Sequence, residues 1–413
     1  MEFSRREWLA LTALVPASMS LRRSTDLQGD RPAAIESRIA AIVAAYGAQG
    51  FHRTATTVDR ASGDWLAEQV RQIGLPPAQE SFELSRVDPI RCELTVGDRR
   101  IDGLPLFDGA FTGAQGIRGR LGAAATDADI VLVDTAVNAA AAGALGDARR
   151  ANRHKAVVAV TRGLRPGLCP SNADAFLRPF GPPVVQVSSA DGSWLGELAA
   201  RGEAAQLIAQ VTRTPATAVN VVTSIQGTAP ERAPFVVMTP RSGWYWCASE
   251  RGGGIACWLE IMRALRAAPL KRTVLFVASS GHELGHLGID AFIARRPGIA
   301  ANAIGWLHLG ANIGAAVDPG TTLQASDDEF DAALTRALTD TGLTVDRRAT
   351  RGAVPAGEAE AVHRGGGRYA SIIGGNGLFH NPDDRGPHAI DAGAIATFSR
   401  AFTTVVRALA DAA

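Results

Sequence analysis

This sequence has little of several residue types that mark special classes of protein. Its 413 residues include four cysteines, four methionines and three tyrosines. The cysteines form no C-x-x-C pair and no zinc-finger spacing, so a cysteine-based metal site is not expected. One or two disulfides among these cysteines are an alternative that the sequence leaves undecided, although the spacing does not argue for them. The four are Cys92, Cys169, Cys247 and Cys257.

Neither sign of charge is in excess. The 42 Lys and Arg residues against 41 Asp and Glu residues leave a formal net charge of +1. This balance gives no indication of a nucleic-acid partner or of binding to an acidic membrane surface. Hydrophobic residues make up 46% of the chain and charged residues 20%, so a large core can be buried. The length is typical of two or three domains.

Long apolar runs are also missing, and no segment is expected to be transmembrane. Residues 1–25 resemble a twin-arginine export signal, because Arg5 and Arg6 stand just before the short apolar run 8–15. We therefore expect a periplasmic or secreted protein. The alternative is an ordinary amphipathic start to the fold, and no clear cleavage site precedes Arg22.

Periodicity predicts an α/β protein with an insertion. Helical patterns at 35–46 and 61–73 are followed by short alternating runs and alanine-rich helices. We expect a mostly parallel central sheet flanked by helices, formed by residues 30–85 and 216–413. Residues 86–215 are expected to form a β-rich inserted domain.

The segment 233–288 is the centre of this prediction. Two continuous apolar strands, 235–238 and 273–278, flank the helical pattern 255–267. Strand, helix and strand in this order indicate a parallel pair joined by a right-handed crossover. In open α/β sheets, ligands bind at the carboxyl ends of such strands, so the loops after these strands are the candidate site.

Histidines and carboxylates follow the carboxyl ends of several predicted strands. A zinc ion needs imidazole nitrogens and carboxylate oxygens from different elements, with one position open for water. The candidate ligands are Glu250, His282, Glu283, His308 and His380. Glu358 and His363, before the last strand, are further candidates to approach this site.

The order of elements resembles the zinc exopeptidase family that includes bacterial leucyl aminopeptidases and glutamate carboxypeptidase. The segment 276–288 is similar to the family's strand followed by Glu-Glu-x-Gly-x-x-Gly, and 378–384 is similar to its final metal histidine in a His-Thr-x-x-Asp setting. The insert resembles a protease-associated domain. The resemblance covers nearly all of the chain after the signal region. It implies an aminopeptidase-like hydrolase of peptide or amide bonds.

The resemblance also implies a metal set. Glu250 stands for the family's bridging aspartate before an Asn-x-x-Gly turn, and His308 stands for its third-strand aspartate. Glu283 and His380 match ligands directly. Pro240-Arg241-Ser242 stands where the family has a His-x-Asp whose histidine binds the first metal, and it offers no ligand. The lost histidine and the positive charge of Arg241 imply at most one zinc ion.

Two catalytic residues follow from the same comparison. His282 stands for the general-base glutamate, and an imidazole with an ordinary pKa near 6.5 suits that role. Arg241, or Arg251, is expected to bind a substrate carboxylate.

Two alternatives stay open. Residues 282–286 match H-E-x-x-H, the pattern of another metalloprotease class, but that pattern needs a helix, and three nearby glycines disfavour one. The other alternative is a protein that kept the fold while its metal centre decayed, leaving a periplasmic binding or scaffold protein.

Overall fold

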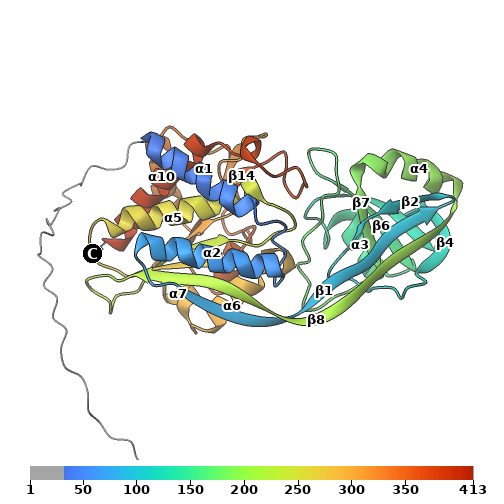
Figure 1. Ribbon diagram of the computed structural model, residues 1–413, viewed down its shortest axis with the longest axis horizontal. Helices are drawn as coiled ribbons and strands as arrows, with labels where there is room; N and C mark the ends of the chain where they lie inside the picture. Colours follow the sequence, from blue (N-terminus) through green and yellow to red (C-terminus); the bar gives the residue numbers. More distant parts are fainter. Residues whose placement is uncertain (1–31, 413) are drawn as a thin grey trace, which may run out of the picture.

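The computed structural model describes residues 32–412, which form two parts joined by a long two-stranded ribbon (Figure 1). The expected export signal, residues 1–25, lies outside the described residues. Within 32–412, no helix combines the length and the apolar character needed to cross a bilayer.

The larger part is a helix-covered mixed sheet, as the sequence predicted. Its strand order is β13-β12-β14-β11-β9-β10-β8, in which β14, β11, β9 and β10 run parallel, while β12 runs antiparallel to β14 and β8 runs antiparallel to β10. The strands are β8 (Ala204–Ile225), β9 (Phe235–Pro240), β10 (Val274–Ser279), β11 (Gly305–Leu309), β12 (Gly320–Ala325), β13 (Arg347–Arg348) and β14 (Tyr369–Gly375).

Helices cover both faces of this sheet. One core contains side chains from α1, α2, α5, α8 and α10, and the other contains side chains from α6, α7 and α9. The helices are α1 (Pro32–Gly47), α2 (Thr57–Ile73), α5 (Gly253–Arg266), α6 (Leu287–Ala294), α7 (Ile299–Asn302), α8 (Asp328–Asp340), α9 (Ala359–Arg364) and α10 (Ala392–Ala410).

The central strand β9 shows why its sequence is a continuous apolar run. Phe235 and Val237 belong to the first core, whereas Val236 and Met238 belong to the second. Successive side chains of a strand point to opposite faces, so a strand covered on both faces needs apolar residues throughout. The pairing of β9 with β10 is parallel, as predicted.

The crossover helix α5 begins tightly against the loop after β11. A Cβ atom on Gly253 would lie 1.9 Å from the carbonyl oxygen of Ile313, so only glycine fits at this position. This close approach brings the start of α5, and with it Glu250, against the ends of the neighbouring strands.

The smaller part is attached through β1 (Ala78–Val96) and β8, which pair along their whole length. The sequence predicted two separate strands, 206–211 and 218–225, where the structure has one strand. Pro215 does not interrupt it, because β8 here pairs only with β1, and a proline is tolerated at a free strand edge. The division at residues 86 and 215 falls within these two strands and stays a prediction.

The rest of the smaller part is a second, mainly parallel sheet with helices on it. Its order is β4-β5-β6-β7-β3. The elements are β2 (Arg99–Asp102), β3 (Leu104–Pro105), β4 (Ile117–Ala123), β5 (Ile130–Ala136), β6 (Ala156–Arg162), β7 (Val184–Ser188), α3 (Gly143–Ala151) and α4 (Gly192–Arg201).

Candidate functional site

The carboxyl ends of β9, β10, β11 and β14 meet at one edge of the large sheet, as the sequence predicted. The candidate residues on the loops there are buried, and Glu250, Glu283, His308 and His380 are each at most 1% exposed. Glu250 and Glu283 stand in separate short turns, His380 follows β14, and His308 stands in β11, so the fold gathers residues from remote segments at this edge.

Glu250 is paired with its own neighbour in sequence. It lies in a π-helical turn, Ala248–Gly252, where its Oε1 is 2.7 Å from Nη2 of Arg251. Burial raises the pKa of the Glu250 carboxyl, but Arg251 and His380 outweigh burial and lower it to about 2. Glu250 is therefore an ionised acid in a buried ion pair.

Arg251 is completely buried, and a hydrogen bond from its Nε holds the side chain in place. Its Nε donates to the carbonyl oxygen of Ser242 at 2.7 Å. Nη1 and Nη2 have no hydrogen-bond partner of good geometry among the described residues, although Nη2 makes the ion pair with Glu250. Arg251 occupies the sequence position where the resemblance has the asparagine of Asn-x-x-Gly.

His380 completes this cluster from the loop after β14. Its Nε2 is 3.3 Å from Oε1 of Glu250, and its Nδ1 is 2.6 Å from the carbonyl oxygen of Pro170. A carbonyl oxygen can only accept, so Nδ1 donates to Pro170 and Nε2 faces Glu250. Pro170 belongs to the smaller part, which therefore reaches the site directly.

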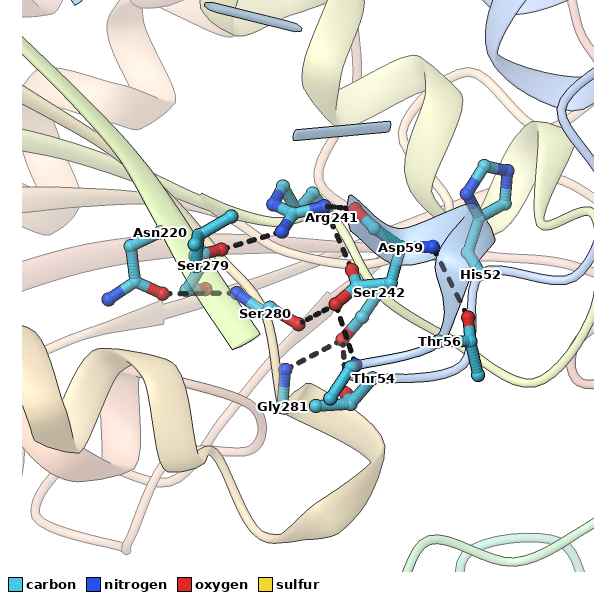
Figure 2. A network of polar contacts seen from close by, with 12 residues as sticks. His52, Thr54, Thr56, Asp59, Asn220, Arg241, Ser242, Ser279, Ser280 and Gly281 are labelled. Carbon is cyan, nitrogen blue, oxygen red and sulfur yellow. Dashed lines mark hydrogen bonds and ion pairs between the residues drawn. The ribbon is translucent and has the colours of Figure 1, made fainter. Parts of the chain in front are cut away.

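Glu283 lies in a short turn after β10, and other groups already satisfy its carboxylate. Oε1 accepts from the backbone N–H and from Oγ1 of Thr54, each at 2.7 Å, and Oε2 accepts from Ser242 Oγ at 2.7 Å. Figure 2 shows Thr54 and Ser242 close to each other, with their hydroxyl oxygens 3.2 Å apart. The carboxylate is thus fixed by three donors.

Arg241 faces away from Glu250. Its Nη1 is 2.8 Å from Asp59 Oδ1, and Nη2 donates to the carbonyl oxygen of Val219 (Figure 2). Sequence analysis expected Arg241 to bring a positive charge beside the metal position, but the arginine beside Glu250 is Arg251. The pairing with Asp59 had no signal in the sequence, because 182 positions separate the two residues.

His282 and Glu358 form a second buried contact. His282 Nδ1 is 3.6 Å from Glu358 Oε1, and Ser279 Oγ is within 2.7 Å of both Glu358 oxygens. Burial raises the pKa of Glu358 to about 8. Burial, followed by the charge of Arg251, lowers the pKa of His282 well below its usual range. Both groups are therefore neutral at pH 7, unlike the near-neutral titration that the sequence suggested for His282.

Of the remaining candidate residues, some lie at the site and others do not. His308 is buried, with Nδ1 2.9 Å from Ser371 Oγ, and burial lowers its pKa to about 3. His363 instead lies beside Tyr369. Residues 282–284 form a single 3-10 turn, and His286 has a φ of 66°, so the helix required by H-E-x-x-H is not formed.

A cavity of about 450 Å³ opens beside the cluster, between the two parts of the molecule. The large part contributes His282, His286 and His308, and the small part contributes Asn172 and Asp174. Two buried imidazole nitrogens, His282 Nδ1 and His308 Nε2, have no hydrogen-bond partner among residues 32–412. The cavity therefore combines polar atoms from both parts.

The described residues do not fit a zinc ion as they are arranged. Within 32–412, no group of three or more His, Cys, Asp or Glu side chains is placed so that it could hold a metal. The reason lies in the contacts above: Arg251 is paired with Glu250, and the carboxylate of Glu283 is satisfied by Thr54 and Ser242. Nothing in the sequence indicated that the guanidinium of Arg251 would pair with Glu250.

The fold is that of the zinc aminopeptidases. BSAP, a zinc aminopeptidase from Bacillus subtilis, matches with a TM-score of 0.73 over 92% of this chain and 97% of its own, at 18% identity. A Peptidase M28 precursor from Shewanella amazonensis SB2B matches with a TM-score of 0.71 over 92% and 96%, at 14% identity. An aminopeptidase from Aneurinibacillus sp. strain AM-1 matches with a TM-score of 0.68 over 93% and 95%, at 14% identity.

These likenesses show the architecture that the sequence resemblance implied, over nearly the whole described chain. No family model matches the sequence, and comparison with curated proteins finds no relative. At such low identity the likeness shows the fold, and fold alone does not define activity.

Proposed function

We propose that this chain is a binding protein on the zinc aminopeptidase fold, which recognises a peptide or small amide without a resident metal. The observation that carries the proposal is the buried Arg251–Glu250 ion pair at 2.7 Å. A carboxylate neutralised by a guanidinium is a poor ligand for a dication, because the ion would have to displace a bound cation and approach its charge.

The cavity has the chemistry that a peptide would need. Asp174 lines the cavity and takes part in no ion pair with any residue between 32 and 412, so it offers a carboxylate to an amino group. Asn172 uses its Oδ1 to accept from Trp244, which leaves its amide N–H groups for a ligand carbonyl. Phe379 and Ile373 add apolar surface for a side chain.

The test combines three measurements on the purified protein. Metal analysis should find no bound zinc, calorimetry should detect binding of short peptides, and the same peptides should stay intact on long incubation. N-acetylated peptides serve as controls, since loss of the amino group should weaken binding if Asp174 recognises it. Release of amino acids by a zinc-loaded sample would refute the proposal.

The second candidate is the metal-dependent peptidase that the resemblance implies, with a single, altered zinc centre. It is favoured by the 3.3 Å separation of His380 Nε2 and Glu250 Oε1, and by the unpartnered nitrogens of His282 and His308. One equivalent of zinc that disappears in His380→Ala, together with peptide turnover, would establish it in place of the binding protein.

Export is a separate part of the proposal, supported by Arg5 and Arg6 before the apolar run 8–15. The pair Arg5→Lys and Arg6→Lys keeps the charge while removing the arginines. We expect this variant to accumulate in the cytoplasm, whereas the natural sequence should appear in the periplasmic or extracellular fraction. If the variant and the natural protein are found in the same fractions, residues 1–25 do not act as a twin-arginine export signal.

A further inference from the structure

The position of Arg251 has a consequence for the chemistry of the cluster. The guanidinium donates through Nε to the Ser242 carbonyl oxygen, and its Nη2 lies 2.7 Å from Oε1 of Glu250. The charged end is therefore fixed from two sides. It cannot reach solvent, because the whole side chain is buried.

Arg251 also supplies the positive charge that its surroundings need. Burial lowers the pKa of Arg251, but Glu250, Cys247, Tyr46 and Glu283 outweigh burial and raise it. The buried imidazoles of His282 and His308 add no charge of their own at pH 7. Without the guanidinium, Glu250 would be a buried carboxylate with only His380 beside it, which is strongly unfavourable.

The spacing around Glu250 matches that of two ligands of one ion. Two donors at roughly 2.0–2.1 Å from a tetrahedral zinc lie about 3.3 Å from each other, and His380 Nε2 is 3.3 Å from Glu250 Oε1. The bond from Nδ1 to Pro170 holds the ring of His380 in this orientation. Two donor atoms therefore lie at the spacing of zinc ligands, and the arginine approaches the same carboxylate oxygen.

We infer that Arg251 is a built-in cation that replaces a metal ion, and that removing its side chain uncovers a latent zinc site at Glu250 and His380. The inference rests on the proposed absence of a resident metal. The arginine joins its own turn, Ala248–Gly252, to the loop of Ser242 through Nε, and it provides this cation at any metal concentration.

The test compares Arg251→Asn and Arg251→Met with the natural protein. After equilibration with zinc and removal of the excess, metal analysis should give about one zinc per chain in both variants and none in the natural protein. Without zinc, both variants should melt at a lower temperature than the natural protein. Adding zinc should raise the melting temperature of the variants and leave that of the natural protein unchanged.

Two matched controls isolate the charge and the burial. Arg251→Lys keeps a cation at this position and should take up no zinc. Arg149→Met breaks another fully buried pair, Arg149–Asp108 at 2.8 Å in the smaller part, and should lower the melting temperature without any response to zinc.

The outcomes separate this inference from the proposed function. Zinc in the natural protein would overturn the proposed function. No zinc in the natural protein and none in either variant would overturn only the inference about Arg251. Failure of both variants to fold even when expressed with added zinc would also count against it, because the ion would then be unable to replace the guanidinium.

Discussion

Nδ1 of His380 lies 2.6 Å from the carbonyl oxygen of Pro170, so the last loop of the large part is bonded to the inserted part. Two further contacts lie beside it: Ala173 N–H donates to the Glu283 carbonyl at 2.8 Å, and Trp244 Nε1 donates to Asn172 Oδ1 at 3.1 Å. The segment that carries these insert residues thus forms one wall of the cavity and is held by the loops that form the candidate site.

Loosening this wall should affect the cavity before it affects the core. Trp244→Phe removes the N–H that Asn172 accepts while keeping an aromatic ring, and one such bond is worth about 1 kcal/mol. We expect faster amide hydrogen exchange in residues 165–176 and weaker peptide binding, beyond the loss of stability that shortening any buried tryptophan causes. Trp306→Phe, at a buried tryptophan outside the site, is the control, and equal exchange in both variants would contradict the role of the wall.

The Arg251–Glu250 pair should show strong coupling in a double-mutant cycle. Each single change, Arg251→Met or Glu250→Gln, leaves one buried group without its partner and should cost about 3–5 kcal/mol of unfolding free energy. The double variant should cost clearly less than the sum, because neither charge is left alone. Denaturant unfolding in the presence of a chelator measures all four proteins, and additive losses would show that the pair does not interact.

Glu358 should make stability depend on pH. Its ordinary pKa is 4.5 and burial raises it to about 8, so between these values the native protein keeps a proton that the unfolded chain has released. The unfolding free energy should therefore fall as pH rises through this window. Glu358→Gln cannot lose a proton, so its stability relative to the natural protein should increase from pH 4.5 to 8. A constant difference would show that Glu358 titrates normally.

The buried histidines give the unfolding free energy the opposite dependence on pH, at lower pH. Burial lowers the pKa of His308 to about 3 and that of His286 to about 4, from an ordinary value of 6.5. Below pH 6.5 the unfolded chain takes up protons that the native protein refuses, so stability is lost as pH falls. His308→Gln should reduce this loss, as measured by denaturant unfolding between pH 4 and 7. His388→Gln, at an exposed residue of the 3-10 turn Pro387–Ala389, is the surface control.

His282 separates binding from catalysis. In a binding protein, His282→Ala should change peptide affinity by a small factor and leave no activity to lose. If His282 is a general base, the same change should cost roughly a hundredfold in turnover. Calorimetry and a peptide-release assay on one pair of samples distinguish these results.

Much of the architecture could be predicted because it depends on local patterns. The continuous apolar residues of β9 and β10 and the periodicity of α5 indicated a parallel pair with a helical crossover, and this prediction is confirmed. The single long strand β8 was missed, since Thr-Pro near its middle is a local signal for a break, whereas pairing with β1 overrides it.

The sequence by itself determined that Glu250, Glu283, His308 and His380 stand at the ends of neighbouring strands, because the alternation of strands and helices fixes which loops share an edge. Only the tertiary structure decided which charges meet there. The pairing of Arg241 with Asp59 and the burial of Arg251 against Glu250 depend on side-chain directions and distances between remote segments. The pattern of residue types along the chain indicates which loops lie at one edge of the sheet. The packing around that edge decides which arginine pairs with each buried carboxylate.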